Sequence, residues 1–237
     1  SMPPRLTGFE NRIWFHEVSA SPYPLFEAEP FSIALASKMA DVAEHHGLEI
    51  MHAHYAIPHA SAALLARMAL DGKLKVVTTL HGTDITVVGA DASYLPMVKL
   101  AIRASDAVTA VSQYLKDETF RTFKVERPIE VIPNFIAPFE RPKADCRSWL
   151  APCSSPILVH ISNFRPVKRV MDVMQVFEKV RAEHPARLVM VGDGPDRRAL
   201  ESYARELGAA DRIAFTGYLR WPEEIKTVYS IADLFMS

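Results

Sequence analysis

Apolar residues in this sequence occur in two patterns, short continuous runs and helical repeats, which alternate along the chain. The continuous runs, such as those over 75–80 and 157–161, predict buried strands. The helical repeats, such as the one over 30–46 that ends at Gly47, predict helices between the strands. Repeated strand, helix, strand order indicates parallel sheets with right-handed crossovers, so the predicted fold class is α/β.

Two such series are predicted, separated by a segment without sustained periodicity. The first contains strands over 12–18, 49–54, 75–80, 107–111 and 129–132, and helices over 30–46, 60–70, 93–104 and 112–123. The second contains strands over 157–161, 187–191, 212–216 and 232–236, with helices that end near Glu183, Leu207 and Ser230. The proline-containing stretch between them resembles a domain connection. We therefore predict a domain over 1–140, a linker over 141–155 and a second domain over 156–237.

Composition excludes several classes of partner. The 237 residues are 49% hydrophobic, which is enough for one or two ordinary cores. Lys and Arg total 27 against 28 for Asp and Glu, so no field of one sign favours a nucleic acid or an anionic membrane. No signal peptide or apolar run of spanning length is present, and Cys146 and Cys153 lack zinc-site spacing. A cytoplasmic protein with reduced thiols and no stable membrane association is expected.

Polar side chains follow the central strand over 75–80. His81-Gly82-Thr83-Asp84 places an imidazole, a flexible backbone and a carboxylate at the carboxyl end of that strand. Ligands bind at this edge in open α/β sheets. The alternative is a structural turn in which Thr83 or Asp84 only caps the next helix.

A second polar cluster follows the strand over 49–54. His52, His54 and His59 raise the possibility of a metal site, but the intervening residues supply no carboxylate ligand. His52 and His54 share a face only if the strand continues through both. We therefore expect no metal.

The second series carries cations after its first strand. Arg165 and Lys168 precede a predicted helix, whose amino end favours an anion such as a phosphate. The alternative is that both are solvated surface cations. Further along, Gly192 and Gly194 follow a strand and would let the backbone approach a ligand.

Five segments, taken in order, resemble glycosyltransferase family 4, and the similarity covers nearly the whole chain. They are His52-Ala-His-Tyr-Ala-Ile-Pro-His59, Thr78-Thr-Leu-His-Gly-Thr-Asp-Ile85, Asp106-Ala-Val-Thr-Ala-Val-Ser112, His160-Ile-Ser-Asn-Phe-Arg165 with Val167-Lys-Arg169, and Val191-Gly-Asp-Gly-Pro195. The resemblance implies the GT-B fold, in which two Rossmann-like domains face a cleft. It also implies an acceptor in the first domain, a nucleotide sugar in the second, and transfer with retention and without a metal or other cofactor.

The subgroup that the chain resembles most moves N-acetylglucosamine from UDP-GlcNAc to the hydroxyl of L-malate, the first step of bacillithiol synthesis. By this resemblance, His81, Arg165 and Lys168 are the expected catalytic residues, with the two cations neutralising the departing diphosphate. The expected donor-binding residues are Asn163, Arg165, Lys168, Gly192, Gly194, Gly217 and Tyr218. The expected acceptor-binding residues are Tyr55, Thr79, Lys99 and Arg103.

The chain departs from the family pattern in two respects. Lys99 stands where related sequences have arginine. A lysine offers a single point charge where arginine would bind a carboxylate through two hydrogen bonds, so the identity of the acceptor is in doubt. Members of the family also have a glycine-rich loop before the part that corresponds to Ser1 and a Glu-x7-Glu motif after the part that corresponds to Ser237. We therefore expect a portion of a longer protein that is inactive by itself, and its assembly into a homo-oligomer stays open.

Two other interpretations remain open. One is a family 4 transferase for another acceptor, such as an inositol phosphate or a lipid-linked sugar. The other is an inactive module that binds a nucleotide sugar or a carboxylate.

Overall fold

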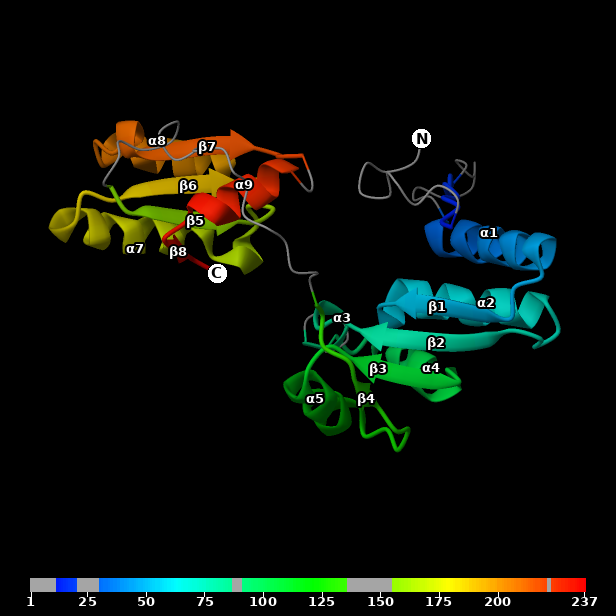
Figure 1. Ribbon diagram of the computed structural model, residues 1–237. Coiled ribbons are helices and arrows are strands. Elements are labelled where there is room, and N and C mark those ends of the chain that lie inside the picture. The colour runs from blue at the N-terminus through cyan, green and yellow to red at the C-terminus, as the bar shows by residue number, and fades with distance from the viewer. Residues whose placement is uncertain (1–11, 21–29, 87–90, 136–154, 221–222) are drawn as a thin grey trace. The chain divides into compact units, whose positions relative to one another are not determined.

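The computed structural model describes residues 12–20, 30–86, 91–135, 155–220 and 223–237. Its contacts divide the chain into two compact units, one formed by residues 16–136 and the other by residues 1–15 with 137–237. Each unit contains a four-stranded parallel sheet (Figure 1). The chain is therefore an α/β protein with two parallel sheets, as the alternation of elements predicts.

The amino-terminal sheet has the strand order β1-β2-β3-β4, so its strands lie side by side in chain order. The strands are β1 (Ile50–His54), β2 (Lys75–Leu80), β3 (Ala107–Ala110) and β4 (Glu130–Val131). The helices are α1 (Phe31–His46), η2 (Ala56–Ala60, an irregular π-type turn), α2 (Ser61–Ala69), α3 (Thr83–Thr86), α4 (Leu95–Ala104) and α5 (Gln113–Phe123). These four strands and the four longer helices match the predicted elements to within a few residues at each end.

One face of this sheet forms the core of its unit. Val76 and Leu80 are fully buried and pack with apolar residues of α2, α4 and α5. Thr78 shares this face and meets its need for a hydrogen bond through the Ser105 hydroxyl, at 2.8 Å. The opposite face is also covered, since Val77 is half-buried and Thr79 is 8% exposed. The predicted buried strand over 75–80 is therefore confirmed.

The predicted strand over residues 12–18 is wrong. Residues 12–20 are described and contain no strand. Val18 packs against α1 through Leu35 and Ala36, whereas Trp14 is 68% exposed. The alternation of apolar residues there reflects contact with a helix, since no described strand pairs with this segment.

The carboxy-terminal sheet has the order β7-β6-β5-β8. Its strands are β5 (Ile157–Ile161), β6 (Arg187–Val191), β7 (Ile213–Gly217) and β8 (Leu234–Phe235). Its helices are η3 (Pro166–Lys168, a 3-10 turn), α7 (Val170–Glu183), α8 (Arg197–Glu206), η4 (Ala210–Arg212, a 3-10 turn) and α9 (Glu223–Ile231). The strands and longer helices predicted for the second series are thus confirmed.

Both faces of this second sheet are covered. Leu158 on β5 belongs to a cluster with residues of α7 and α8, while its neighbour Val159 belongs to a separate cluster with Val228 and Ile231 of α9. Because successive side chains on a strand point to opposite faces, a continuous apolar strand is required here.

His160 is a buried polar residue within β5. Its Nδ1 lies 2.9 Å from the carbonyl oxygen of Met236 and its Nε2 lies 2.8 Å from the Ser162 hydroxyl. Burial lowers the pKa of His160, which a hydrogen bond to the Met236 carbonyl partly offsets. A carbonyl only accepts, so Nδ1 carries the proton of the neutral ring and Nε2 accepts from Ser162. One tautomer therefore links the end of β5 to the segment after β8.

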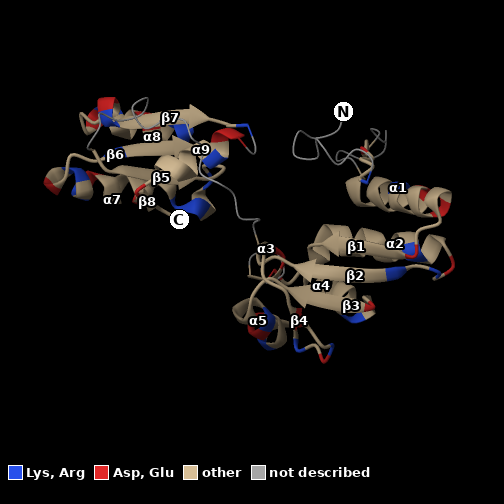
Figure 2. Cartoon of the chain, in the orientation of Figure 1, with Lys and Arg blue, Asp and Glu red and all other residues tan. Residues whose placement is uncertain are grey.

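Some expectations lie outside the described residues. Cys146, Cys153 and most of the predicted linker belong to this group. In the part of the chain that is described, no helix is both long enough and apolar enough to cross a bilayer. Lys and Arg are interspersed with Asp and Glu on the helices of each unit (Figure 2).

Candidate functional site

The carboxyl ends of β1 and β2 lie next to each other, as parallel pairing requires. His54 is in register with Thr79, and the Tyr55 N–H donates to the Thr79 carbonyl at 2.9 Å. The two loops that leave these strands therefore start side by side. This brings His81 to the same edge as the histidines of β1.

Asp84 holds these two loops together. Its Oδ1 accepts from the backbone N–H groups of His81 and Gly82, at 3.2 and 3.0 Å. Its Oδ2 accepts from the Ala56 N–H in the other loop, at 2.9 Å. The side chain is only 2% exposed, so these three donors replace water around a buried carboxylate. Asp84 thus does more than cap a helix, because it fixes one strand end against the other.

We expect Asp84→Asn to lower the free energy of unfolding by about 2 kcal/mol, because the amide NH2 would face one of three N–H donors and leave it buried without an acceptor. Chemical denaturation measures this loss. Asp91→Asn is the matched control, since Asp91 makes a similar bond to the Ser93 N–H at 2.9 Å but in an exposed turn. Equal stability losses in both variants would contradict the structural role given to Asp84.

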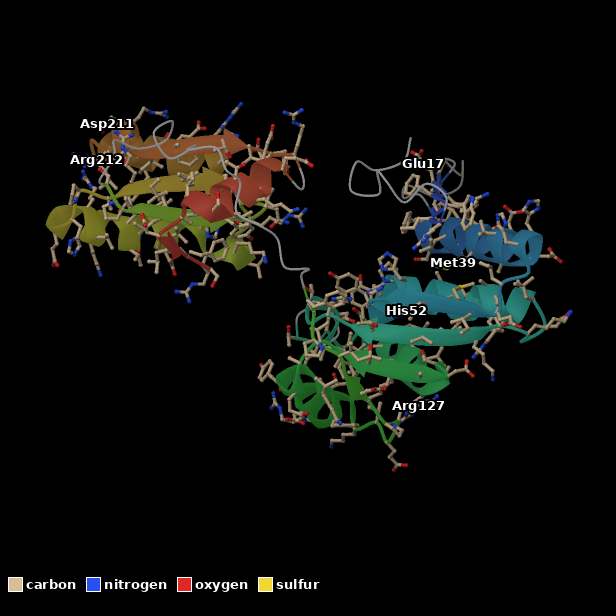
Figure 3. The ribbon with its side chains drawn as sticks, viewed as in Figure 1. Glu17, Met39, His52, Arg127, Asp211 and Arg212 are labelled. Carbon is tan, nitrogen blue, oxygen red and sulfur yellow. The ribbon has the colours of Figure 1, made fainter. Side chains whose placement is uncertain are left out.

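Aromatic rings gather at this edge. His54 Nδ1 and His81 Nε2 are 2.7 Å apart, within hydrogen-bond distance. The rings of His52 and His54 stack with centroids 4.6 Å apart, and the Tyr55 ring lies 5.0 Å from that of His81. Figure 3 labels His52 on β1. The structure therefore brings Tyr55 and His81 together and adds His54 as a direct partner of His81.

The backbone of Tyr55 is strained. Its φ and ψ are 78° and 134°, a combination that a bulky residue rarely adopts. The N–H bond to Thr79 and a bond from the Ala60 N–H to the Tyr55 carbonyl, 3.1 Å long, hold it in place. Such strain costs roughly 1–3 kcal/mol and concentrates at functional sites. It supports a functional position for Tyr55, and the sequence gives no sign of it.

Thr79 is at the expected place, but its hydroxyl is already engaged. Oγ1 lies 2.7 Å from His52 Nε2 and 2.7 Å from Thr109 Oγ1, and the residue is 8% exposed. A hydroxyl has one proton and two lone pairs, so two partners leave room for at most one more. His52, Thr79 and Thr109 thus form a row of hydrogen-bonded side chains across three neighbouring strands. The sequence did not predict that His52 and Thr109 would contact Thr79.

Two histidines at this edge, His52 and His81, favour their neutral forms. Burial lowers the pKa of His81, the neighbouring His54 lowers it further, and Asp84 partly opposes both effects. Burial also lowers the pKa of His52, with smaller contributions from His54 and His81. Among the described residues, no group of three or more His, Cys, Asp or Glu side chains is placed to hold a metal ion.

Arg103 does not belong to this edge, which corrects its assignment to the acceptor site. It lies at the end of α4 and lines a hollow of about 330 Å³ with Glu126 and Arg127. Arg127 donates to the backbone carbonyl of Asp106, just before β3, and Figure 3 shows it beside the amino ends of the strands. Helix α4 runs back along the sheet, so its last turn lies at the opposite edge from His81. Lys99, one turn earlier, is half-buried.

The cations of the carboxy-terminal unit surround the start of α7. Arg165 precedes η3 and Lys168 is the last residue of that turn; both are exposed, as is Asn163. The Lys168 ammonium is close enough to lower the pKa of His160. Arg169 adds a third cation, but it is paired with Asp172 on α7. The amino end of α7 and two exposed cations would suit an anion.

Gly192 and Gly194 let two loops lie closely against each other. A Cβ on Gly192 would lie 1.9 Å from the Ser162 carbonyl oxygen, and one on Gly194 would lie 2.6 Å from that of Asn163. The space is filled by the loop after β5, so these glycines permit contact between two loops. Their effect on a ligand would be indirect, through the position of Asn163 and Arg165.

Gly217 and Tyr218 end β7, and Tyr218 is 76% exposed. Sequence reasoning missed Arg197 here. Its Nη1 would lie 3.5 Å from a Cβ on Gly217, and its guanidinium pairs with Asp193 at 3.0 Å. In the sequence, the only sign that Arg197 lies near Gly217 is its place one helical turn after Gly192-Asp193-Gly194.

Family models match both halves of the chain. The model "Glycosyltransferase Family 4" matches residues 2–138, and the model "Glycosyl transferases group 1" matches residues 144–237. The chain belongs to glycosyltransferase family 4. The predicted family is thereby confirmed.

Curated relatives of this family 4 chain include two named enzymes. It is 41% identical to N-acetyl-alpha-D-glucosaminyl L-malate synthase of Bacillus anthracis, over 99% of this chain and 62% of that protein. It is 27% identical to a GDP-mannose-dependent alpha-(1-6)-phosphatidylinositol monomannoside mannosyltransferase of Mycolicibacterium smegmatis, over 93% of this chain and 57% of that protein. The chain thus spans about three fifths of the length of these relatives.

Solved structures show the same fold. Anabaena Alr3699/HepE in complex with UDP and glucose aligns with a TM-score of 0.68 at 18% identity, over 91% of this chain and 58% of that one. Sucrose-phosphate synthase from Thermosynechococcus elongatus aligns with a TM-score of 0.67 at 19% identity, over 92% and 58%. These alignments support the GT-B class for the two parallel-sheet units.

Proposed function

We propose that the protein of which this chain forms all or part transfers N-acetylglucosamine from UDP-GlcNAc to the hydroxyl of L-malate. The observation that carries the proposal is the 41% identity, over 99% of this chain, to the malate synthase of Bacillus anthracis. In the reaction, the bond between the anomeric carbon and the diphosphate breaks and a bond to the malate oxygen forms, with the anomeric configuration kept. The malate hydroxyl proton passes to the departing diphosphate. No metal is required.

The carboxy-terminal unit is the proposed donor-binding unit. Arg165 and Lys168 lie before α7, where the helix dipole also favours an anion. Negative charge develops on the departing UDP, so cations at this place would stabilise the transition state. Asn163, Gly217 and Tyr218 lie at the ends of β5 and β7, in reach of a nucleotide bound along the same sheet edge.

The amino-terminal unit is the proposed acceptor-binding unit. Tyr55 is 37% exposed, its ring lies beside that of His81, and its backbone is strained. Its hydroxyl would donate to a malate carboxylate, and Thr79 would contribute through the hydrogen-bonded row that includes His52. Lys99 remains a proposed source of positive charge on α4.

Turnover of UDP-GlcNAc by the full-length protein tests this function. We expect UDP release that depends on L-malate, with glycerol 3-phosphate and inositol phosphate as comparison acceptors. Malate-dependent release that is no faster than release with either comparison acceptor would reject the malate assignment. Transfer to inositol phosphate would instead favour an acceptor like that named for the mannosyltransferase relative.

We expect Tyr55→Phe to raise the KM for L-malate about tenfold, equal to about 1.4 kcal/mol, because a hydrogen bond to a charged carboxylate is lost. UDP affinity should stay within twofold. Tyr114→Phe is the matched control, since Tyr114 lies on α5 with 71% of its surface exposed. An unchanged malate KM, or an equal loss of UDP affinity, would place the acceptor elsewhere.

A further inference from the structure

The carboxyl edge of the amino-terminal sheet has many imidazoles and few permanent cations. Residues 52–60 and 79–86 contain His52, His54, His59 and His81 but no Lys or Arg. The one carboxylate among them, Asp84, is buried, and its oxygens accept from three backbone N–H groups. Within these two segments, histidine is therefore the only residue type that can carry positive charge toward a bound anion.

Two of these rings are joined directly. His54 Nδ1 and His81 Nε2 are 2.7 Å apart, and two ring nitrogens at that distance share one hydrogen between them. At least one ring must then be unprotonated at that nitrogen. The pair can accept one further proton while keeping its hydrogen bond, but a second would place two N–H groups against each other.

The surroundings of His81 lower its pKa, with burial as the main cause. His52 stacks on His54, Tyr55 packs beside His81, and His59 Nδ1 bonds the His54 carbonyl at 2.8 Å. The charged groups that act on His81 are His54, which lowers its pKa, and Asp84, which raises it less. Without a ligand, His81 therefore favours its uncharged form, and its hydrogen-bonded partner His54 offers a second ring that can share an added proton.

We infer that His54 and His81 act as one unit that takes up a single proton when an anionic group of a substrate binds at this edge. This inference rests on the proposed function, which supplies two such groups, the carboxylates of the acceptor and the diphosphate of the donor. His54 acts as a positioning residue: its Nδ1 occupies His81 Nε2 and leaves His81 Nδ1 as the nitrogen that can meet the substrate. The imidazolium charge is then shared between two rings.

Isothermal titration calorimetry of the full-length protein at pH 8 tests the inference, with L-malate in one arm and UDP in the other. Each titration is run in phosphate and in Tris, whose ionisation enthalpies differ, so the difference in heat gives the number of protons taken up. We expect uptake approaching about one proton in the arm whose anion meets the pair, and an affinity that falls about tenfold per pH unit above that pH. If neither L-malate nor UDP binding is accompanied by proton uptake, the inference is overturned.

Variants of His54 show whether the proton is taken up by the His54–His81 pair or by another group. His54→Phe removes the partner of His81 and should reduce uptake at least twofold, while His54→Asn keeps an acceptor near the position of Nδ1 and should retain most of it. His184→Asn, at the exposed end of α7, is the control and should change nothing. Full uptake in His54→Phe would show that the two rings do not act together.

Nitrogen-15 NMR of the histidine rings gives a result that does not depend on activity. In the ligand-free protein, the His81 ring should change its tautomer balance and its titration when His54 is replaced by Phe, and less when it is replaced by Asn. An identical His81 titration in all three proteins would overturn the inference. If neither malate nor UDP binds, the proposed function fails, and the NMR titration still decides whether the rings form one unit.

Discussion

Gly192→Ala is expected to lower the free energy of unfolding by about 4 kcal/mol, because overpacking costs roughly 3 and a non-glycine residue at positive φ roughly 1. The φ of Gly192 is +116°, and the added Cβ would lie 1.9 Å from a backbone oxygen of Ser162. The atoms nearest this Cβ position are all backbone atoms of Ser162, so no flexible side chain can move aside to relieve the overlap. Chemical denaturation measures the loss, and UDP binding should weaken as well because the displaced loop continues to Arg165.

Gly208→Ala is the matched control for this prediction. Gly208 also has a positive φ, +59°, but nothing lies within 4 Å of its Cβ position. It should lose only the conformational part, about 1 kcal/mol. If the two variants lose equal free energy of unfolding, the contact between the loops after β5 and β6 does not restrict the size of the side chain at residue 192.

Lys168→Ala is expected to weaken UDP binding about a hundredfold, equal to about 2.8 kcal/mol, because a charge-assisted contact to a diphosphate is lost. The rate of transfer should fall at least as much, since more charge develops on UDP as it leaves. Calorimetry with UDP and steady-state kinetics on the full-length protein measure the two effects separately.

Arg169→Ala provides the comparison for Lys168. Both cations lie in the same turn before α7, but Arg169 is paired with Asp172. Its removal should change UDP affinity by no more than about threefold, since its charge is already compensated. If the two variants weaken UDP equally, the site responds to overall positive charge and Lys168 has no special contact.

The order of elements was open to prediction from the sequence because it depends on local pattern. The runs at 75–80 and 157–161 are strands because continuous apolar residues need burial, and α1 ends at Gly47, whose φ is 61°. The strand predicted over 12–18 was wrong because that prediction, too, used only the local pattern. Its alternation is that of a strand, but a strand also needs a partner, which no local pattern reveals.

Placement at the sheet edge was open to prediction in the same way, because parallel strands bring their carboxyl ends together. That rule put Tyr55 and Thr79 at the same sheet edge, and Arg165 with Lys168 before a helix. It could not place Arg103, since one extra helical turn moves a side chain about 5 Å further from the edge and toward the hollow near Arg127.

By itself, then, the sequence determined the α/β class, the family and the strand ends that carry polar residues, all of which depend on residue order and spacing. Only the tertiary structure decided which atoms meet. The bond between His54 and His81, the bond from the Ala56 N–H to Asp84 and the closeness of Gly192 to Ser162 join residues from separate segments of the chain. Such contacts depend on how neighbouring strands are aligned and how far each loop extends, and neither quantity can be read from one segment alone.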